Sequence, residues 1–381
     1  MIVLGVAQVD CELQFVKLFG ANALTKMYEI INRCVYYNFM GLTCRGSDRN
    51  LAELKISVNL GEGYNDPMRF VECTIVAEKY GFNTVWFGDH LLPWIHSQNK
   101  SAFVWSVLPV ALDRTKRVNI GVLVTSPIGG RYHPLVIGQA AATLDNMFPG
   151  RFRLGVGSGE AVNENFFFVD NWPRWTERMN RLAEAVELMR TMWRSEDYFL
   201  YRGKFFKTTD FYLYTKPKMT IPIYFAAQGK KAAAYAGVYG DHLVTINSAE
   251  TCREVIFPAF EQAAKEVGKD PSKMDKIVEV QLHFTDKDSG VKEIRKSGEA
   301  GFLAKDSFGE SDPRKIQTLS ESVSDEKIAE NWCFASSAED VISVIEKYQQ
   351  AGATHIELVT HSFPDRIKFV GEKILPYFKK I

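Results

Sequence analysis

The chain has 381 residues, of which 46% are hydrophobic and 24% charged, with 46 Lys and Arg against 46 Asp and Glu. This length allows one large barrel or two ordinary domains, and the balanced charge excludes a global field that attracts nucleic acid or acidic membranes. No apolar run reaches the roughly 20 residues that span a bilayer, and the opening MIVLGVAQVD lacks the features of a secretory signal. We therefore expect a small-molecule partner, and neither a nucleic-acid nor a membrane partner.

Six cysteines stand at positions 11, 34, 44, 73, 252 and 333, and no two of them form a C-x-x-C pair. In a chain of this length such spacing indicates neither a disulfide framework nor a zinc site. We expect reduced thiols in a cytoplasmic protein, and no bound metal.

Residues 1–53 show no strand or helix period that continues into the rest of the chain. They form either an appended helix or arm, or a segment upstream of a natural start near Leu51. The second interpretation is favoured, because the regular pattern begins only at Lys55. We assign no function to this N-terminal extension and place the catalytic domain at residues 54–381.

From Lys55 onward, strand-like and helix-like segments alternate. The expected strand segments are KISVNLGEG, TVWFGDH, VNIGVLVTSP, RFRLGVGSGEA, PIYFAAQG, HLVTIN, KIVEVQLHFTD and HIELVTH. Long helices are expected over PMRFVECTIVAEKYG, over HPLVIGQAAATLDNMF and from Trp175 to Trp193, where apolar residues recur at steps of three and four. Shorter helices follow the strands PIYFAAQG and HLVTIN, and a last helix ends the chain.

Most of these eight strand segments are continuous apolar runs, which is typical of a parallel sheet buried on both faces. Eight βα-type units predict a (β/α)8 fold, the TIM barrel. An open doubly wound sheet is the alternative, and it is disfavoured because no G-x-G-x-x-G turn follows the first strand. Residues 194–221 and 287–335 are too long for simple connections, so we expect them to cover the barrel mouth or its edge.

Polar side chains gather directly after the expected strands, where a TIM barrel builds its active site. These residues are Glu62, Asp89, His90, Trp94, Thr125, Ser126, Ser158, Glu160, Asn163 and Gln228. A single carboxylate at such a place is usually a helix cap or a loop hydrogen bonder. Together, however, the carboxylates, the histidine and the tryptophan predict general acid–base chemistry on a substrate held against an aromatic face.

Small residues accompany this set. Gly155, Gly157 and Gly159 would let the backbone approach a flat ligand closely. The segment AAQG opens a helix whose N-terminus is a ready phosphate site, reinforced by Lys230 and Lys231. A plain turn beside a solvated lysine pair is the other interpretation, and both stay open.

The segments that carry these residues resemble one family. GDHLLPW, SAFVW, RYHP, FPGRFRLGVGSGEAVNE, YFAAQG and NWCFASS are similar to the F420-dependent branch of the bacterial luciferase-like superfamily, above all to its glucose-6-phosphate dehydrogenases and secondary alcohol dehydrogenases. The resemblance covers residues 54–381. It implies a homodimeric oxidoreductase that moves a hydride between a CH–OH group and the deazaflavin coenzyme F420.

The resemblance also implies residue roles. His90 would act as the base, Trp94 would lie beside the transferred hydride, Glu160 beside the deazaflavin ring, and Glu62 would be the carboxylate from the first strand. The residues implied to hold the cofactor are Asp89, Leu123, Val124, Ser126, Gly159, Ala161, Asn163, Ala227, Gln228 and Gly229. A cis peptide bond would join Leu123 to Val124.

The chain departs from the sugar-phosphate enzymes where those bind phosphate. In that group two lysines and an arginine hold the phosphate, whereas Asn247, Ser307 and Asn331 occupy the corresponding positions here. A phosphate dianion without charge-assisted partners binds poorly. We therefore expect these three residues to contact a neutral alcohol or carbonyl substrate, although Lys305 stands close enough to restore one contact.

The sequence disfavours two other functions. The motifs D-H-x-x-P-W and G-S-G-E-A argue against an FMN-dependent monooxygenase, and intact His90, Trp94 and Glu160 argue against a non-catalytic flavin-binding relative. Outside the motifs, His133 is expected to start a helix. Packing or rim positions are expected for His242, His283, His355, His361, Trp105, Trp172 and Trp332.

Overall fold

The computed structural model describes residues 54–61, 66–168, 171–305, 307–360 and 362–379. These residues belong to one unit, Glu53–Ile381. The expectations for residues 1–53, Glu62 and His361 lie outside the described residues.

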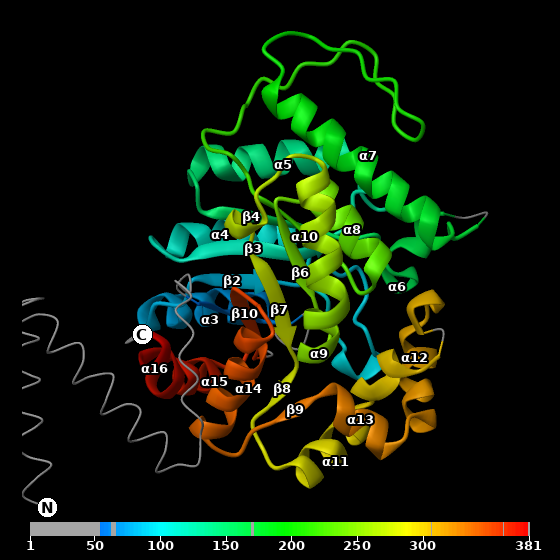
Figure 1. Cartoon of the computed structure of the whole chain (residues 1–381). Helices are drawn as coiled ribbons and strands as arrows, with labels where there is room; N and C mark the ends of the chain where they lie inside the picture. Colours follow the sequence, from blue (N-terminus) through cyan, green and yellow to red (C-terminus); the bar gives the residue numbers. More distant parts are fainter. Residues whose placement is uncertain (1–53, 62–65, 169–170, 306, 361, 380–381) are drawn as a thin grey trace, which may run out of the picture. The chain divides into compact units, whose positions relative to one another are not determined.

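Eight parallel strands close into a barrel (Figure 1). In chain order they are β1 (Lys55–Asn59), β2 (Thr84–Phe87), β3 (Asn119–Thr125), β4 (Phe152–Val156), β5 (Ile223–Ala226), β6 (His242–Thr245), β7 (Lys276–Val280) and β10 (His355–Val359). The barrel closes between β1 and β10, where Lys55 lies opposite His355. The expected TIM barrel is confirmed, and the closed strand order rules out the open sheet.

The strands are apolar on both sides because each side is covered. Trp86 of β2 points into the barrel and packs there with Leu123 and Tyr224, while Val85 and Phe87 join the larger core under the helices. The interior has little spare room: a Cβ atom added at Gly121 would lie 2.3 Å from the Trp86 ring. Glycine at this position of β3 is therefore what allows the indole to fill the barrel.

Helices surround the barrel. They are α3 (Pro67–Tyr80), α4 (Val104–Arg114), α5 (Pro134–Met147), α7 (Trp175–Arg194), α8 (Lys230–Tyr239), α10 (Phe257–Glu266), α14 (Ala338–Gln350), α15 (Pro364–Phe369) and α16 (Leu375–Lys379). The helix expected over Trp175–Trp193 is α7. His133 starts α5, as expected, since its ring accepts a hydrogen bond from the Leu135 amide. The helices α4 and α14, which were not predicted from the sequence, complete the layer.

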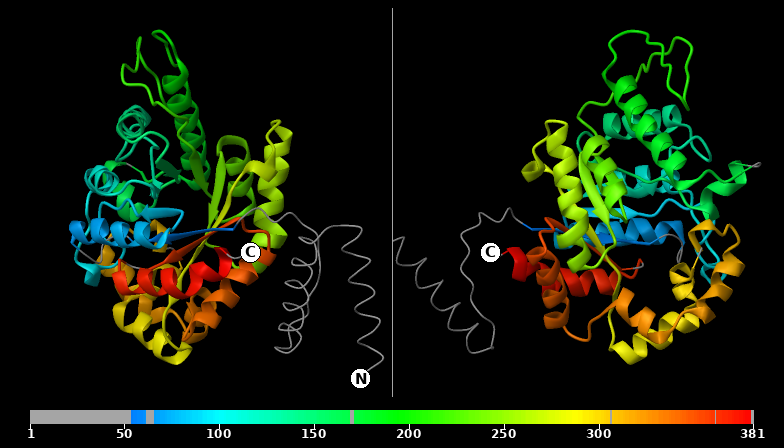
Figure 2. Two further views of the ribbon diagram at one scale, coloured as in Figure 1. Left: turned by 90° about the vertical axis from the view of Figure 1, so that its left-hand side faces the viewer. Right: turned by 45° about the vertical axis from the view of Figure 1, so that its right-hand side comes forward.

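The second long connection forms a lobe of its own beside the barrel (Figure 2). Its elements are β8 (Leu282–His283), α11 (Lys287–Ser297), η5 (Glu299–Leu303), η6 (Ser307–Gly309), α12 (Pro313–Leu319), η7 (Ser320–Ser322), α13 (Asp325–Asn331) and β9 (Cys333–Phe334). The expected single strand KIVEVQLHFTD is thus split, because β7 ends at Val280 and β8 pairs with β9 outside the barrel. Ile294, Ile328 and Trp332 form part of a separate apolar core in this lobe, which we call the insertion lobe.

Residues 194–221 lie on the other side of the barrel, beyond the end of α7 (Figures 1 and 2). Phe206 and Leu213 of this segment pack on residues of α5 and α7. Residues 194–221 were expected to cover the barrel mouth or its edge, but they cover the helices α5 and α7. The insertion lobe alone reaches the large cavity described below.

No helix in the described part of the chain is long and apolar enough to cross a membrane. The cysteines in the same part, Cys73, Cys252 and Cys333, are free thiols. Burial raises the pKa of both Cys73 and Cys252 to about 12, so these thiols are protonated and unreactive at neutral pH.

The barrel contains a buried histidine that makes its stability depend on pH. His355 Nε2 lies 2.8 Å from Ser57 Oγ, and burial lowers the pKa of His355 from 6.5 to about 3. An unfolded chain takes up a proton at this histidine below pH 6.5, whereas the folded chain does not. Stability is therefore complete above pH 6.5 and is lost as the pH falls toward 3.

We expect the free energy of unfolding to fall by about 2 kcal/mol between pH 6.5 and pH 5 because of His355, as 1.36 kcal/mol per pH unit implies. Urea unfolding followed by circular dichroism at a series of pH values measures this slope. The variant His355→Gln should lack the contribution of His355 to the slope, whatever its stability at pH 7. An unchanged slope in the variant would assign the acid sensitivity to other groups.

Candidate active site

One large cavity, about 740 Å³ in volume, opens at the carboxyl-terminal ends of the barrel strands. Every barrel strand contributes to its lining near or just beyond its carboxyl-terminal end, through Asn59, Asp89, Leu123, Gly157, Ala226, Val244, Glu279 and Val359. The carboxyl-terminal face is where TIM barrels carry out chemistry. The cavity is therefore the candidate active site.

The cavity brings together most of the residues singled out from the sequence. Those that line it are Asp89, His90, Trp94, Leu123, Val124, Ser126, Gly159, Glu160, Asn163, Gln228 and Gly229. Ala161 and Ala227 are buried and are not among the lining residues. The peptide bond between Leu123 and Val124 is cis, as expected.

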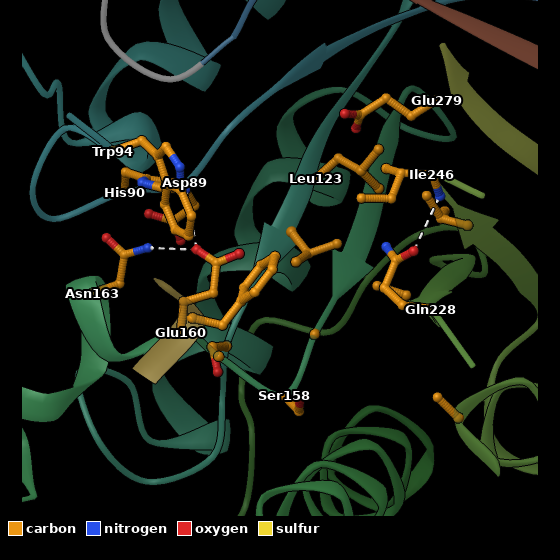
Figure 3. A pocket seen from close by; sticks show the side chains of 18 of the residues that line it. Asp89, His90, Trp94, Leu123, Ser158, Glu160, Asn163, Gln228, Ile246 and Glu279 are labelled. Carbon is orange, nitrogen blue, oxygen red and sulfur yellow. Dashed lines mark hydrogen bonds and ion pairs between the residues drawn. The ribbon is translucent and has the colours of Figure 1, made fainter. Parts of the chain in front are cut away.

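His90 and Glu160 lie next to one another in the cavity (Figure 3). His90 Nδ1 lies 3.2 Å from the carbonyl oxygen of Leu92, which can only accept a hydrogen bond. In the neutral ring Nδ1 therefore carries the hydrogen, and Nε2 is the nitrogen that can take up a proton. Nε2 lies 3.6 Å from Glu160 Oε2. Burial lowers the pKa of His90, and the nearby Glu160 charge opposes this effect.

Asp89 anchors the segment that carries His90. Its carboxylate is fully buried and accepts hydrogen bonds from Thr125 Oγ1 at 2.6 Å and from the Tyr132 hydroxyl at 3.0 Å. Arg131 Nη1 lies 3.1 Å from the same carboxylate and neutralises its charge. These contacts fix the loop after β2, so Asp89 positions His90, the residue that follows it, in the cavity.

Asn163 connects that loop to the next functional segment. Its Oδ1 accepts a hydrogen bond from the Leu91 amide at 2.9 Å, and its Nδ2 donates to Glu160 Oε2 at 3.3 Å. The Trp94 ring lies 6.1 Å from the His90 ring in an edge-on arrangement (Figure 3). One amide side chain thus sets the position of the histidine loop relative to the carboxylate that faces it.

The same loop is fastened to the insertion lobe. Just after Trp94, the Ser97 amide donates to Gln317 Oε1 at 2.8 Å, and Ser97 Oγ donates to the Ser297 carbonyl at 2.9 Å. Trp94 itself packs on Phe308 with ring centroids 5.5 Å apart. The loop that carries Trp94 is therefore held by α12 and by the end of α11 as well as by the barrel.

A carboxyl group close to Glu160 in the sequence was missed by sequence reasoning. Glu164 ends α6 (Ala161–Glu164), one helical turn after Glu160, and its buried carboxylate accepts a hydrogen bond from the Arg131 amide at 3.0 Å. Burial raises the pKa of Glu164 to about 7, against the effect of Arg131. The sequence contains the signal for this residue, because Glu164 ends the motif GSGEAVNE one helical turn after Glu160, and residues one turn apart share a face.

Other lining residues had no local signal in the sequence. They are Gln98, Trp175, Arg178, Glu279, Gln281, Glu299, Phe308 and Trp332. Conversely, Asn247, Ser307 and Asn331 are not among the residues that line the cavity. Asn331 Nδ2 donates to the Lys327 carbonyl on the surface of α13, and Asn247 Nδ2 donates to the Gln228 carbonyl.

Of the three glycines in this region, Gly157 and Gly159 lie beyond the end of β4 and line the cavity, whereas Gly155, within β4, does not. A Cβ atom added at Gly155 would lie 2.4 Å from the Val122 carbonyl oxygen, and one at Gly157 would lie 2.5 Å from Val124 Cγ2. These glycines let β4 approach the part of β3 that contains the cis bond. The expectation that Gly155 admits a flat ligand is wrong, since it does not line the cavity.

The remaining wall fits a flat cofactor that carries phosphate. Ser126 Oγ is buried at the cavity and has no hydrogen-bond partner among the described residues. The lining also includes the start of α8, where Gly229 is the N-cap and makes no side-chain cap hydrogen bond, together with Lys230 and Lys231 of the first turn. A helix N-terminus with two lysines attracts a phosphate group, and an unpartnered hydroxyl suits a polar ring edge.

Comparison with known proteins identifies the family. Residues 49–355 match the model of the luciferase-like monooxygenase family. The chain is 35% identical over 309 residues to an F420-dependent glucose-6-phosphate dehydrogenase of Segniliparus rotundus, covering 80% of this chain and 91% of that protein. It is 33% identical over 308 residues to the enzyme of the same name from Rhodococcus erythropolis, with 80% and 91% covered.

Among solved structures, the chain is similar to an F420-dependent secondary alcohol dehydrogenase in complex with an F420–acetone adduct. The TM-score is 0.79 at 36% identity, over 85% of this chain and 98% of that one. The chain therefore belongs to the luciferase-like family, within its branch of F420-dependent oxidoreductases.

Proposed function

We propose that this protein transfers a hydride between the CH–OH group of an alcohol without phosphate and coenzyme F420. The observation that carries the proposal is the pairing of His90 Nε2 with Glu160 Oε2 at 3.6 Å, beside Trp94, in the cavity at the barrel mouth. Relatives that are one third identical depend on F420, and one was solved with an adduct of F420 and acetone. We therefore expect this chain to use the same coenzyme.

The side chains divide the work. When bound, F420 supplies the carbon that accepts or returns the hydride. His90 removes the hydroxyl proton at Nε2, since its Nδ1–H is directed to the Leu92 carbonyl. Glu160 stabilises the protonated imidazole that results, because its carboxylate faces Nε2. Trp94 and Trp332, both buried, keep water from the reacting atoms.

Ser126, Gly229, Lys230 and Lys231 would hold the coenzyme. The purified protein should accordingly bind F420 more tightly than FMN, which fluorescence titration of each cofactor measures. Lys231→Ala should weaken F420 binding by about tenfold or more, as for one charge-assisted hydrogen bond. Lys218→Ala, an exposed lysine of residues 194–221, is the matched control.

Tighter binding of FMN than of F420 would contradict the proposal and favour the second candidate, a flavin-dependent monooxygenase. The observation in favour of that candidate is the matching family model, because its description is luciferase-like monooxygenase. Absorbance of the bound cofactor separates the two, since FMN shows a band in the blue that the deazaflavin lacks.

Three finer expectations accompany the proposed function. We propose that the protein is a homodimer, which sedimentation equilibrium tests, and that it acts in the cytoplasm, which fractionation tests. We also propose that residues 54–381 form the catalytic domain by themselves. A chain without residues 1–50 that fails to bind the coenzyme would contradict the last of these.

A further inference from the structure

One wall of the cavity carries a row of polar side chains that the hydride transfer does not use. Alternate residues of an extended chain point to the same side, and Glu279 and Gln281 both line the cavity at the end of β7. Gln281 Nε2 donates to Glu279 Oε1 at 2.7 Å. Two residues further, His283 Nε2 lies 3.6 Å from Glu299 Oε2, and Glu299 also lines the cavity. We call Glu279, Gln281 and Glu299 the polar strip.

Aromatic rings also line the cavity, and one of them lies near this strip. Phe308 and Trp332 of the insertion lobe and Trp94 of the histidine loop all contribute to the lining. The Trp332 ring lies 6.5 Å from the ring of His283, the residue that contacts Glu299. The cavity thus offers flat apolar faces together with oxygen acceptors. Such a combination fits a molecule that has C–H surfaces and hydroxyl groups at its edges.

The charges of the lining residues argue against an anionic substrate at the strip. Among the described residues that line the cavity, the cationic side chains are Arg178, Lys230 and Lys231, from α7 and α8. The wall from Glu279 to Trp332 contributes two carboxylates and no Lys or Arg to that lining. Carboxylate oxygens accept hydrogen bonds, as Glu279 Oε2 accepts one from Asn59 Nδ2 at 3.3 Å, so hydroxyl groups of a ligand can donate to this wall.

We propose that the substrate is a neutral polyhydroxylated alcohol, an unphosphorylated polyol or sugar, which donates hydroxyl hydrogen bonds to Glu279 and Glu299 while its reacting hydroxyl faces His90. This rests on the proposed function and names the substrate class. An alcohol with a single hydroxyl, which faces His90, offers no further donor to Glu279 and Glu299. A site built to pair with hydroxyl groups discriminates strongly against a substrate that lacks them.

The first test compares kcat/KM for glycerol, sorbitol and glucose with kcat/KM for propan-2-ol. The loss of the oxidised F420 absorbance band measures each rate. We expect the best polyhydroxylated substrate to exceed propan-2-ol by at least about 100-fold. Equal or faster oxidation of propan-2-ol would overturn the inference. So would the highest rate with 1-aminopropan-2-ol, because the carboxylates would then select a cation.

The second test uses the variant Glu299→Gln, with Glu321→Gln on the exposed surface of η7 as the matched control. In the Glu299 variant the ratio of kcat/KM for the best polyol to that for propan-2-ol should fall about tenfold or more, through KM. The control should keep the ratio of the wild type. A ratio that does not change in the Glu299 variant would overturn the assignment of the strip.

Binding is measured apart from turnover by calorimetric titration of polyols into protein loaded with reduced F420, which cannot accept a hydride. Glu299→Gln should weaken this binding about tenfold, and Glu321→Gln should leave it unchanged. If no alcohol is oxidised, the proposed function fails, while the titration still decides whether the strip binds polyols. Absence of polyol binding to the wild type would overturn the inference even if propan-2-ol were oxidised.

Discussion

Replacing His90 with alanine is expected to lower turnover of the alcohol by about two to four orders of magnitude, the usual contribution of a positioned general acid–base group. The variant loses the nitrogen that receives the hydroxyl proton, Nε2, and the partner of Glu160. Affinity for F420 should change much less, because Ser126 and the first turn of α8 lie elsewhere in the cavity wall. Steady-state kinetics combined with a coenzyme titration measures both quantities.

His96→Ala is the matched control, because His96 is exposed in the same loop and does not line the cavity. Its turnover should stay within about twofold of the wild type. In the wild type, kcat/KM should decrease only at acidic pH, since burial holds the pKa of His90 below its ordinary value of 6.5. Wild-type turnover by His90→Ala would reduce His90 to a structural role.

Glucose 6-phosphate is expected to be a poor substrate or none, although relatives that act on it are one third identical to this chain. The resemblance implies that Asn247, Ser307 and Asn331 replace the cations that hold the phosphate in the sugar-phosphate enzymes, and none of these three residues lines the cavity. Two cations of the insertion lobe do not replace them. Lys305 is exposed outside the lining, and Arg314 Nη2 pairs with Asp312 Oδ2 at 2.8 Å.

The size of the effect follows from the bonds that are missing. Each charge-assisted hydrogen bond to a phosphate contributes roughly 1.5–3 kcal/mol, so the loss of three costs at least about three orders of magnitude in affinity. Competition assays with glucose 6-phosphate and a neutral alcohol, at equal concentrations, measure the preference. Saturable oxidation of glucose 6-phosphate at micromolar concentrations would return this chain to the sugar-phosphate group.

The barrel and one half of the site could be predicted from the sequence because their signals are local. His90, Trp94 and Glu160 follow buried strands directly, and parallel strands bring their carboxyl ends to one face. Once the strands were recognised, the proximity of these residues followed without any knowledge of the loops.

The other half was predicted only as a segment over the barrel mouth or edge, residues 287–335, because the residues that line the cavity depend on how this lobe folds. Glu299, Phe308 and Trp332 lie in a stretch that reads as a polar connection, and only its own apolar core turns them toward the barrel. The end of β7 at Val280 was missed for a similar reason. The apolar pattern continues through Leu282, while the pairing partner of that residue, Cys333, comes from far along the chain.

The two hydrogen bonds of Ser97 have a consequence for the evolution of this enzyme. In many barrels a loop that recognises the substrate can be exchanged while the reacting groups stay in place. Here the lobe that we propose to select the substrate also holds the strand-end loop of Trp94, through Gln317 and the Ser297 carbonyl. A mutation that reshapes the lobe for a new substrate is therefore expected to move the Trp94 indole as well. Selectivity and catalytic rate are inherited together in this chain.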